Sequence, residues 1–436
     1  MTSHASNVPD VSFVIPSYNV EDYIVRCLES VKHQRGLSFE AIVINDASTD
    51  NTERLIKDTV GDDERFKVVS KKNNEGLHLA RKTGAALTEG RYVYFLDGDD
   101  ELVPNFCELI SAPKFDSGAD IYRLGMKIVP DGETDPSTIP ALDAMYNSAE
   151  GGARGIEILQ RAFSDALPVR DTWSVVACLY AGDFCRESFE QMTSTRLDYF
   201  EDCYEFFVLA SRAKRLENIT ELRAFNYHYG AGMTGQGVLP VTRFAWDVNA
   251  IHIMVEELDR YLASHPELSS YSSWISKQCL EMIRWDWMTR VSLSNQAKAI
   301  EAIADIWGVS AAEYVLLDPL IGRAIWVLDA SAPEDEMFSE WSLAFDLLQR
   351  REKIDARSDK VDSTKEDEYR DFQRQIIALK EAEQARLTIA REKEDDERRD
   401  RIKRDSRLLR RLFNHFFPYG SRRRRILSAA AREARS

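Results

Sequence analysis

The chain has 436 residues, 44% of them hydrophobic, and its formal net charge at pH 7 is −16. This length and hydrophobic content are typical of a large soluble enzyme with a substantial core and two or three domains. No apolar stretch reaches the length of about 18 residues that a membrane-spanning helix needs, and the polar residues 1–10 show no signal peptide. The six cysteines lack CxxC or paired metal-ligand spacing, so we expect reduced thiols in a cytosolic protein.

Apolar segments and helical stretches alternate through the first hundred residues. A helix is expected over residues 20–34, and a second helical stretch carries Arg81. This alternation predicts a largely parallel sheet with helices on both faces. Ligands of such sheets bind beyond the carboxyl ends of the strands, where the polar residues of each segment gather. The expected strands are 11–15, 39–44, 66–69 and 92–96.

The fourth expected strand ends in DGDD, which brings Asp97, Asp99 and Asp100 to one point. Gly98 allows a sharp turn there. Crowded carboxylates repel one another unless a cation or a donor-rich ligand compensates. Their oxygens suit Mg²⁺ or Mn²⁺, which commonly share their coordination sphere with a diphosphate. The pattern therefore predicts a site for metal-bound phosphate, with a solvated acidic turn as the alternative.

Four ordered segments resemble the successive motifs of family 2 glycosyltransferases. A lone DxD motif is weak, whereas a chance match of the ordered series over about ninety residues is improbable. The resemblance continues less sharply over residues 173–236, and it implies the GT-A nucleotide-diphospho-sugar transferase fold, an α/β fold with a mainly parallel sheet. The segments are VSFVIPSYNVEDYIVRCLESV, EAIVINDASTDNT, NEGLHLARKTGAALTEG and YVYFLDGDD.

This resemblance implies roles for residues of the nucleotide half. Pro16 and Tyr18 resemble the loop that holds the nucleotide base. Asp46 matches the carboxylate that accepts a hydrogen bond from uracil, although a turn-capping role is the alternative. Asp50 and Arg81 match further positions of the nucleotide site, where Arg81 supplies a cation beside the base or the phosphates.

The resemblance also assigns the acidic turn. Asp97 and Asp99 match the DxD pair, in which the first carboxylate commonly lies near the ribose and the second binds the metal. Both are therefore candidate ligands of Mg²⁺ or Mn²⁺. Asp100 lies beside them and is expected to bind the donor sugar. The donor is expected to be a UDP-sugar, with GDP- and dTDP-sugars left open.

The candidate chemistry lies in the acceptor half. Glu201 and Asp202 precede an aromatic, apolar helical stretch and resemble the ED motif of the family. Inverting transfer needs a base to take the proton of the acceptor hydroxyl, and Asp202 is our candidate. Glu201 then orients the acceptor or the helix terminus. The alternative is that both carboxylates simply cap the positive end of the helix.

Residues 224–236 form a Gly-rich aromatic segment that resembles the closing loop of the family site. His228 is a candidate contact for the metal or the diphosphate, although a single histidine is more often structural. Many relatives have a basic residue where Tyr229 or Gly230 stands. The glycines Gly230, Gly232 and Gly235 would permit a lid to move. Trp173 and the following Cys178-Leu179-Tyr180 resemble the acceptor-side strand, with a core role as the alternative.

The C-terminal part of the chain changes character twice. Residues 241–350 are expected to be a helical domain, with acceptor binding or dimerisation as further roles. Residues 351–400 are dominated by charged side chains, which predicts a long solvated helix or a short coiled coil. The sequence thus predicts five parts. The nucleotide half and the acceptor half of the transferase domain are 1–125 and 126–240. They are followed by the helical domain 241–350, the charged helix 351–400 and the basic tail 401–436.

The tail reverses the charge of the chain. Residues 401–436 carry a net charge of +10, which leaves −26 on the rest. Apolar residues from Ile402 to Phe417 fall on one helical face before Pro418-Tyr419-Gly420 breaks the helix. This pattern fits attachment to an anionic inner membrane leaflet, with a tail docked on its own acidic body as the alternative. The strongly acidic body argues against a general nucleic-acid-binding protein.

The sequence as a whole predicts an inverting, metal-dependent glycosyltransferase. It is expected to use a nucleotide-sugar, most simply a UDP-sugar, and to extend a cell-surface glycan or a lipid-linked acceptor at the cytoplasmic membrane face. A sugar-phosphate nucleotidyltransferase is one alternative, and a catalytically silent membrane adaptor is another. The sequence leaves open whether the protein is a homodimer.

Overall fold

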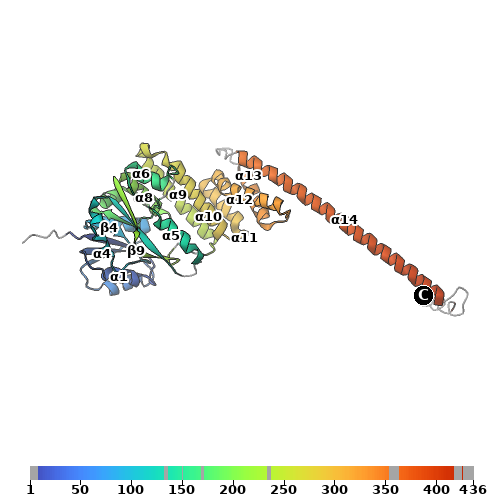
Figure 1. Cartoon of the computed structure of the whole chain (residues 1–436), viewed down its shortest axis with the longest axis horizontal. Coiled ribbons are helices and arrows are strands. Elements are labelled where there is room, and N and C mark those ends of the chain that lie inside the picture. The colour runs from blue at the N-terminus through green and yellow to red at the C-terminus, as the bar shows by residue number, and fades with distance from the viewer. Residues whose placement is uncertain are drawn as a thin grey trace, which may run out of the picture. The chain divides into compact units, whose positions relative to one another are not determined.

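The computed structural model describes residues 8–131, 136–149, 151–167, 171–232, 237–352, 363–416 and 425. In this part of the chain, nine strands form one mixed sheet (Figure 1). Eight of them follow the order β3-β2-β1-β4-β8-β6-β9-β5, and β7 pairs with β9. The strands are β1 (Val11–Ser17), β2 (Phe39–Asn45), β3 (Phe66–Ser70), β4 (Tyr92–Phe95), β5 (Glu101–Leu102), β6 (Ile121–Pro130), β7 (Gly152–Arg154), β8 (Cys178–Ala181) and β9 (Arg215–Tyr229).

The first four strands form the parallel half of the sheet, as the sequence predicts. In the registers of β1 with β2 and β4, Val11 pairs with Phe39 on one side and with Tyr92 on the other. The half that follows is mixed, because β8 runs antiparallel to both β4 and β6 while β6 and β9 are parallel. The predicted fold class is confirmed, and the antiparallel β8 is the feature that alternation of strands and helices did not reveal.

Helices pack on the sheet through apolar faces, as α1 shows. In α1 the buried residues are Ile24, Cys27, Leu28 and Val31, whose spacing of one, three and four residues places them on one side of the helix. The helices of this part are α1 (Ile24–Lys32), α2 (Thr52–Val60), α3 (Leu77–Ala86), α4 (Phe106–Ile110), α5 (Ile139–Asn147), α6 (Ile156–Phe163), α7 (Gly182–Gln191) and α8 (Glu201–Arg212).

Among the described residues six longer helices follow, and the first five occupy the region that the sequence predicts to be helical. The chain divides into two compact units, and the helical region contributes to both. Unit 1 comprises residues 1–316 and 343–361, and unit 2 comprises residues 317–342 and 362–436. The helices are α9 (Val241–Ala263), α10 (Tyr271–Arg290), α11 (Leu293–Trp307), α12 (Val309–Asp329), α13 (Glu336–Glu352) and α14 (Ser363–Phe416).

Unit 2 contains α14, a helix of 54 residues. Its first turns have a core, because Tyr369 and Ile376 are buried and the Tyr369 hydroxyl lies 3.0 Å from the Ser342 hydroxyl. Every side chain described from Glu381 to Arg407 is exposed. The predicted solvated helix is therefore present, and its backbone continues into the basic segment, whereas the predicted break at Pro418 lies outside the described residues.

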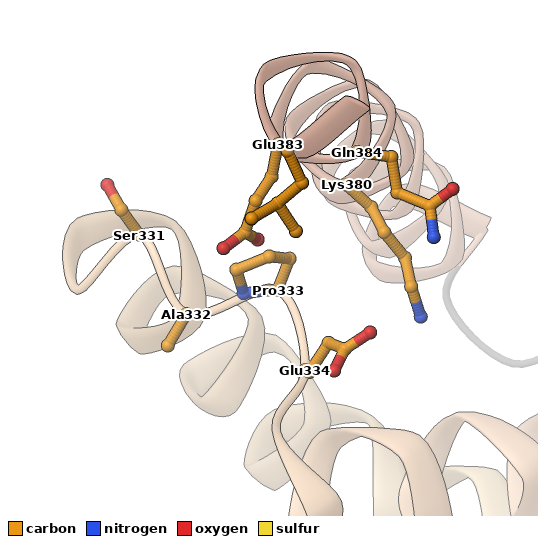
Figure 2. Close-up of a pocket in the computed structure, with 8 residues that line it drawn as sticks. Ser331, Ala332, Pro333, Glu334, Lys380, Glu383 and Gln384 are labelled. Atoms are coloured by element: carbon orange, nitrogen blue, oxygen red, sulfur yellow. The ribbon is translucent and has the colours of Figure 1, made fainter. Parts of the chain in front are cut away.

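A shallow hollow of about 250 Å³ also belongs to unit 2. Figure 2 shows Lys380, Glu383 and Gln384 of α14 facing the turn from Ser331 to Glu334. Charged and small side chains line this hollow, and none of the motif residues contributes to it. In the described part of the chain, no helix is both long and apolar enough to span a bilayer. All six cysteines are buried and unpaired.

Candidate active site

The DxD turn follows β4 directly at the edge of the sheet. The Asp100 N–H donates to the Asp97 carbonyl at 3.1 Å, which closes the turn. A Cβ on Gly98 would lie 3.2 Å from the Pro16 carbonyl oxygen, a tighter contact than most side chains tolerate. The structure therefore packs the turn against the end of β1, so that Pro16 and the DxD carboxylates share one edge of the sheet, as predicted.

Arg81 joins the DxD turn to the ED motif. The side chain is almost completely buried, and its Nη2 lies 3.0 Å and 3.2 Å from the two carboxylate oxygens of Asp97. Its Nη1 lies 3.1 Å from Glu201 Oε1 and 3.0 Å from Glu205 Oε2. Arg81 was expected to offer a cation to the nucleotide, but in this structure its charge is already engaged by three carboxylates.

Glu205 and His78 complete this buried network, and the sequence analysis missed both. His78 Nδ1 lies 2.8 Å from Glu205 Oε1, and Nε2 lies 3.1 Å from the Thr193 carbonyl oxygen. Because a carbonyl oxygen only accepts hydrogen bonds, Nε2 carries a proton. The signal was available in part, since Glu205 follows Glu201 by four residues and therefore lies on the same helix face.

The surroundings of Asp99 disfavour the charged form of its carboxyl group. Burial, together with the charge on Asp97, raises the pKa of Asp99 to about 6. Arg26 donates from Nη2 to the Asp99 backbone carbonyl at 2.8 Å, so this arginine stabilises the turn through its backbone. A Cβ on Gly232 would lie 2.5 Å from Asp99 Oδ2, which places the start of the expected lid directly over this carboxylate.

Asp100 and His228 are linked to each other. The His228 N–H donates to Asp100 Oδ1 at 2.8 Å, which ties the end of β9 to the DxD turn. Burial and the charge on Asp99 raise the pKa of Asp100 well above its usual range. The His228 ring lies between Glu101 and Asp131, each 3.4 Å from a ring nitrogen. Both residues therefore stabilise the loop in this structure, while the predicted lid glycine Gly235 lies outside the described residues.

Asp202 is half-buried in the first turn of α8. Its Oδ1 accepts the Cys203 N–H at 2.8 Å, a contact typical of a carboxylate at a helix N-terminus. Burial raises the pKa of the Asp202 carboxyl well above its usual range, and the Glu201 charge adds to this effect while Arg81 opposes it. Burial likewise raises the pKa of Glu201, against the lowering effect of Arg81. The two neighbouring carboxylates thus differ in their partners. Glu201 binds Arg81, whereas Asp202 accepts the Cys203 N–H and does not bind Arg81.

Two tyrosines come within the electrostatic field of Asp202, and neither was singled out from the sequence. Burial raises the pKa of Tyr146 in α5, and the charges of Asp202 and Asp100 contribute to the shift. Burial raises the pKa of Tyr199 as well, with contributions from several acidic side chains that include Asp202. Both phenols therefore stay protonated near the candidate base and can donate hydrogen bonds.

The expected base-binding residues are placed at the same edge but have different contacts. Tyr18 is 45% exposed, so its ring is open to a ligand. Asp46 is buried, and its carboxylate accepts the N–H groups of Glu75 at 3.0 Å and Gly76 at 2.8 Å. The Asp50 carboxylate accepts the N–H of Thr52, the first residue of α2, at 2.9 Å. For Asp46 and Asp50, the contacts present are those of turn and helix caps.

The carboxylates of the acidic turn could supply part of the coordination sphere of a divalent cation. In the described part of the chain, no group of three or more His, Cys, Asp or Glu side chains is arranged to hold a metal ion. Asp97 and Asp99 therefore supply an incomplete site. Mg²⁺ typically binds one or two protein carboxylates and takes its remaining ligands from water and substrate phosphates. The raised pKa of Asp99 indicates where a cation would relieve the repulsion between the two carboxylates.

Comparison with known proteins agrees with the order of the motifs. The family model described as "Glycosyl transferase family 2" matches residues 12–140, which contain the DxD turn and Arg81. Residues 12–140 of this chain thus match the model of a family 2 glycosyltransferase domain. The match begins in β1, and the ED pair on α8 lies beyond the matched residues.

Two curated relatives are similar to part of this chain. Hyaluronan synthase of Pasteurella multocida is 36% identical over 132 residues, which cover 30% of this chain and 14% of that protein. Teichoic acid poly(glycerol phosphate) polymerase of Staphylococcus epidermidis is 38% identical over 93 residues, which cover 21% of this chain and 13% of that protein. The similarity thus spans about a seventh of either relative's length.

One solved structure is similar over more of the chain. The crystal structure of S. aureus TarS 1-349 in complex with UDP-GlcNAc is 17% identical, with a TM-score of 0.49. It covers 81% of this chain and 94% of that one.

Proposed function

We propose that this protein is an inverting, metal-dependent glycosyltransferase that moves a sugar from a nucleotide-sugar to a hydroxyl group of a glycan or a lipid-linked acceptor. One observation carries the proposal. Arg81 binds Asp97 of the DxD turn and Glu201 of the ED pair at the same time. Donor-side and acceptor-side carboxylates are thus held around one buried cation, as a transfer between two substrates requires.

The reaction proceeds by a single displacement. Asp202 takes the proton from the acceptor hydroxyl, and that oxygen attacks C1 of the donor sugar from the face opposite the diphosphate. The bond from C1 to the diphosphate oxygen breaks, and the nucleoside diphosphate leaves with the bonding electron pair. The configuration at C1 is therefore inverted. The raised pKa of Asp202 supports this role, because a stronger base accepts the proton more readily.

Asp97 and Asp99 would hold a Mg²⁺ or Mn²⁺ ion together with the donor diphosphate. When bound, such an ion supplies Lewis-acid stabilisation of the charge that develops on the leaving group. Arg81 keeps the Asp97 carboxylate in one orientation, and Glu201 receives its position from the same guanidinium group. Neither residue needs to contact the sugar for this arrangement to work.

The donor is proposed to be a UDP-sugar. Tyr18 is exposed at the strand edge and can stack on the base. Asp46 is proposed to accept from uracil through the acceptor capacity that the two backbone N–H groups leave on its carboxylate, since two oxygens provide about four lone-pair positions. GDP- and dTDP-sugars are the competing donors in the test below.

The acceptor is proposed to be a growing surface polymer or its lipid-linked precursor. Two relatives of the domain are named as enzymes of polymer synthesis, a hyaluronan synthase and a teichoic acid polymerase. The tail from residue 401 to 436 is proposed to hold the enzyme on an anionic cytoplasmic membrane face. Its charge of +10 supports this, as does the helical backbone that α14 keeps through Phe416.

The decisive experiment is calorimetric titration with a panel of UDP-, GDP- and dTDP-sugars, with and without Mn²⁺. We expect Mn²⁺-dependent binding of one nucleotide-sugar by the wild type and none by Asp99→Ala. Folded wild-type protein that binds no nucleotide-sugar would overturn the proposal and favour the silent adaptor. An NMR analysis of the first product that showed a retained anomeric configuration would overturn the single displacement.

A further inference from the structure

Two tryptophans outside the motifs are exposed on neighbouring helices of unit 1. Trp246 of α9 is 40% exposed, and Trp285 of α10 is 54% exposed. A single exposed aromatic residue is ordinary on a protein surface, whereas a group of them on one face marks a binding surface. Whether these two indoles form one binding surface therefore depends on the arrangement of α9 and α10.

The two helices run antiparallel, and the indoles project from the same side of the pair. The Leu239 N–H, just before α9, donates to the Arg290 carbonyl at the end of α10. Asp247 of α9 and Asp286 of α10 are both buried, and their charges act on each other across the helix pair. Each tryptophan precedes one of these aspartates by one residue, a rotation of about 100° around the helix. Because the helices are antiparallel, that rotation turns both indoles toward the same side.

The two buried aspartates beside the tryptophans in sequence retain hydrogen-bonding capacity. Arg243 Nε donates to Asp247 Oδ1 at 2.8 Å, and Arg290 Nη1 donates to Asp286 Oδ1 at 3.0 Å. Among the described residues, these bonds use one oxygen of each carboxylate, so the other oxygen can still accept. The Arg243 guanidinium also lies over the Trp246 ring, with 4.8 Å from Cζ to the ring centroid, which stabilises the indole.

Tyr199 connects this surface to the candidate catalytic base. It precedes Asp202 by three residues, at the entry to α8. Burial raises the pKa of the Tyr199 phenol, and the charges of Asp286, Asp247 and Asp202 all contribute. The ring of Phe207 in α8 packs against Tyr261 of α9 and Tyr271 of α10, so α8 lies against the helix pair. The Tyr199 phenol is in the electrostatic field of both the helix pair and Asp202, and it remains a hydrogen-bond donor.

We propose that Trp246, Trp285, Asp247, Asp286 and Tyr199 form a subsite for a saccharide acceptor, next to the ED pair. This inference rests on the proposed transferase function and adds the place where the acceptor chain is held. A pyranose ring has an apolar C–H face and a rim of hydroxyl groups. An indole ring can cover the apolar face while neighbouring carboxylates and a phenol bind the hydroxyl groups.

A saccharide matches this surface better than a second copy of the chain or a lipid tail. Each carboxylate is already neutralised by an arginine of its own helix, so the surface offers acceptors without a strong net field. Neutral hydroxyl groups suit such a surface, whereas a lipid tail would leave the remaining carboxylate oxygens without partners.

The first test is ¹⁹F NMR of the full-length protein labelled with 5-fluorotryptophan and assigned by single Trp→Phe substitutions. The probes are chitotetraose, maltotetraose and a hyaluronan tetrasaccharide. We expect the Trp246 and Trp285 resonances to shift with at least one probe. Trp326 is the matched control, because it is 46% exposed and also lies under an arginine, with Arg323 Cζ 3.9 Å from its ring centroid.

Three results would overturn the subsite. The resonances of Trp246 and Trp285 fail to shift with every probe, they shift together with Trp326, or they depend on protein concentration without any saccharide. The last result would identify the face as a contact between copies of the chain.

The second test measures affinity for the saccharide that gives the largest shift. We expect Trp246→Ala and Trp285→Ala each to raise its Kd about tenfold, because buried aromatic contacts dominate such sites. Trp326→Ala should leave the Kd unchanged. Nucleotide-sugar binding in the same samples separates the two ideas. If it is absent in the wild type, the transferase proposal fails, whereas intact donor binding with no saccharide binding refutes only the subsite.

Discussion

Arg81 and Asp97 are joined by two hydrogen bonds, from Nη2 to Oδ1 at 3.0 Å and from Nη2 to Oδ2 at 3.2 Å. The same guanidinium group binds Glu201 and Glu205 through Nη1. The DxD turn and the first turn of α8 therefore share one buried cation. A change on either side is transmitted to the other, because each carboxylate constrains where the guanidinium lies.

Arg81→Ala is expected to destabilise the protein strongly. Removing one partner of a buried ion pair leaves the remaining charges uncompensated and typically costs about 3–5 kcal/mol. Chemical denaturation measures the loss in the free energy of unfolding. Arg91 is the matched control, because its bond to Asp116 is also 3.0 Å but both side chains are more than half exposed. Arg91→Ala should cost less than about 1 kcal/mol, and equal losses in both variants would contradict the buried network.

Asp202→Asn is expected to lower kcat by a factor of about 100 to 10,000, since general-base catalysis contributes this much in enzymes. Donor binding should be retained, because Asp202 faces the acceptor in the proposed reaction. Steady-state kinetics and donor titration measure the two quantities. Asp183→Asn is the control, because Asp183 also lies in the first turn of a helix but its side chain is 92% exposed. A variant Asp202→Asn with wild-type kcat would rule out Asp202 as the base.

The rate is expected to rise with pH through the raised pKa of Asp202. Burial and the Glu201 charge hold this pKa well above its usual range, so at mildly acidic pH the base is protonated and inactive. The ascending limb of kcat against pH should therefore lie well above the pH at which an ordinary aspartate ionises. The residual activity of Asp202→Asn should lack this limb. If the limb is the same in both proteins, another group controls the rate.

Asp99→Asn is expected to stabilise the metal-free protein at neutral pH. A folded-state pKa of about 6 lies above that of an unfolded aspartate, so the ionised carboxylate disfavours folding. The penalty grows between about pH 4 and pH 6 and is complete above that range. The gain in the free energy of unfolding should be about 1–3 kcal/mol at pH 7.5 and absent at pH 3.5.

With Mn²⁺ and the nucleotide-sugar present, this order should reverse. The wild type then gains stability from binding, whereas Asp99→Asn does not. Thermal unfolding with and without both ligands measures the reversal. A wild type and an Asp99→Asn variant that gain equally would remove Asp99 from the metal site.

Neutralising the four arginines from Arg422 to Arg425 by Arg→Gln substitution is expected to weaken membrane binding. Each basic residue near an anionic surface contributes about 1 kcal/mol, so the four substitutions should cost about a hundredfold or more in partition coefficient. Co-sedimentation with vesicles of mixed anionic and zwitterionic lipid measures the loss. Added salt should reproduce part of it in the wild type. Equal binding to purely zwitterionic vesicles would contradict an electrostatic attachment.

The parallel half of the sheet could be predicted because its strands are continuous apolar runs. Strands 11–15, 39–44 and 66–69 were expected within two residues of β1, β2 and β3. β1 and β2 are buried, so hydrophobicity alone marks them, whereas the edge strand β3 is only partly buried. The position of β8 between β4 and β6 could not be predicted, because pairing of strands far apart in the sequence depends on tertiary contacts.

The candidate site, too, could be predicted only in part. Asp97, Asp99, Glu201 and Asp202 were identified from short motifs, and the structure brings the two pairs together through Arg81. The contacts of Arg81 with Glu205, and of Glu205 with His78, could not be foreseen, since they join residues more than a hundred positions apart. Local sequence indicates which residues carry charge, but only the folded chain shows which charges neutralise one another.

The exposed part of α14 sets how far the basic end of the helix lies from the buried first turns, and it also sets the direction in which that end faces. From Glu381 to Arg407 its described side chains touch no core, and acidic residues precede basic ones by four positions, as in Glu394 with Arg398 and Glu397 with Arg401. Such pairs stabilise a helix that stands alone. Each residue adds about 1.5 Å of length and about 100° of rotation. Inserting or deleting one residue would therefore change the direction in which the basic end points far more than its reach.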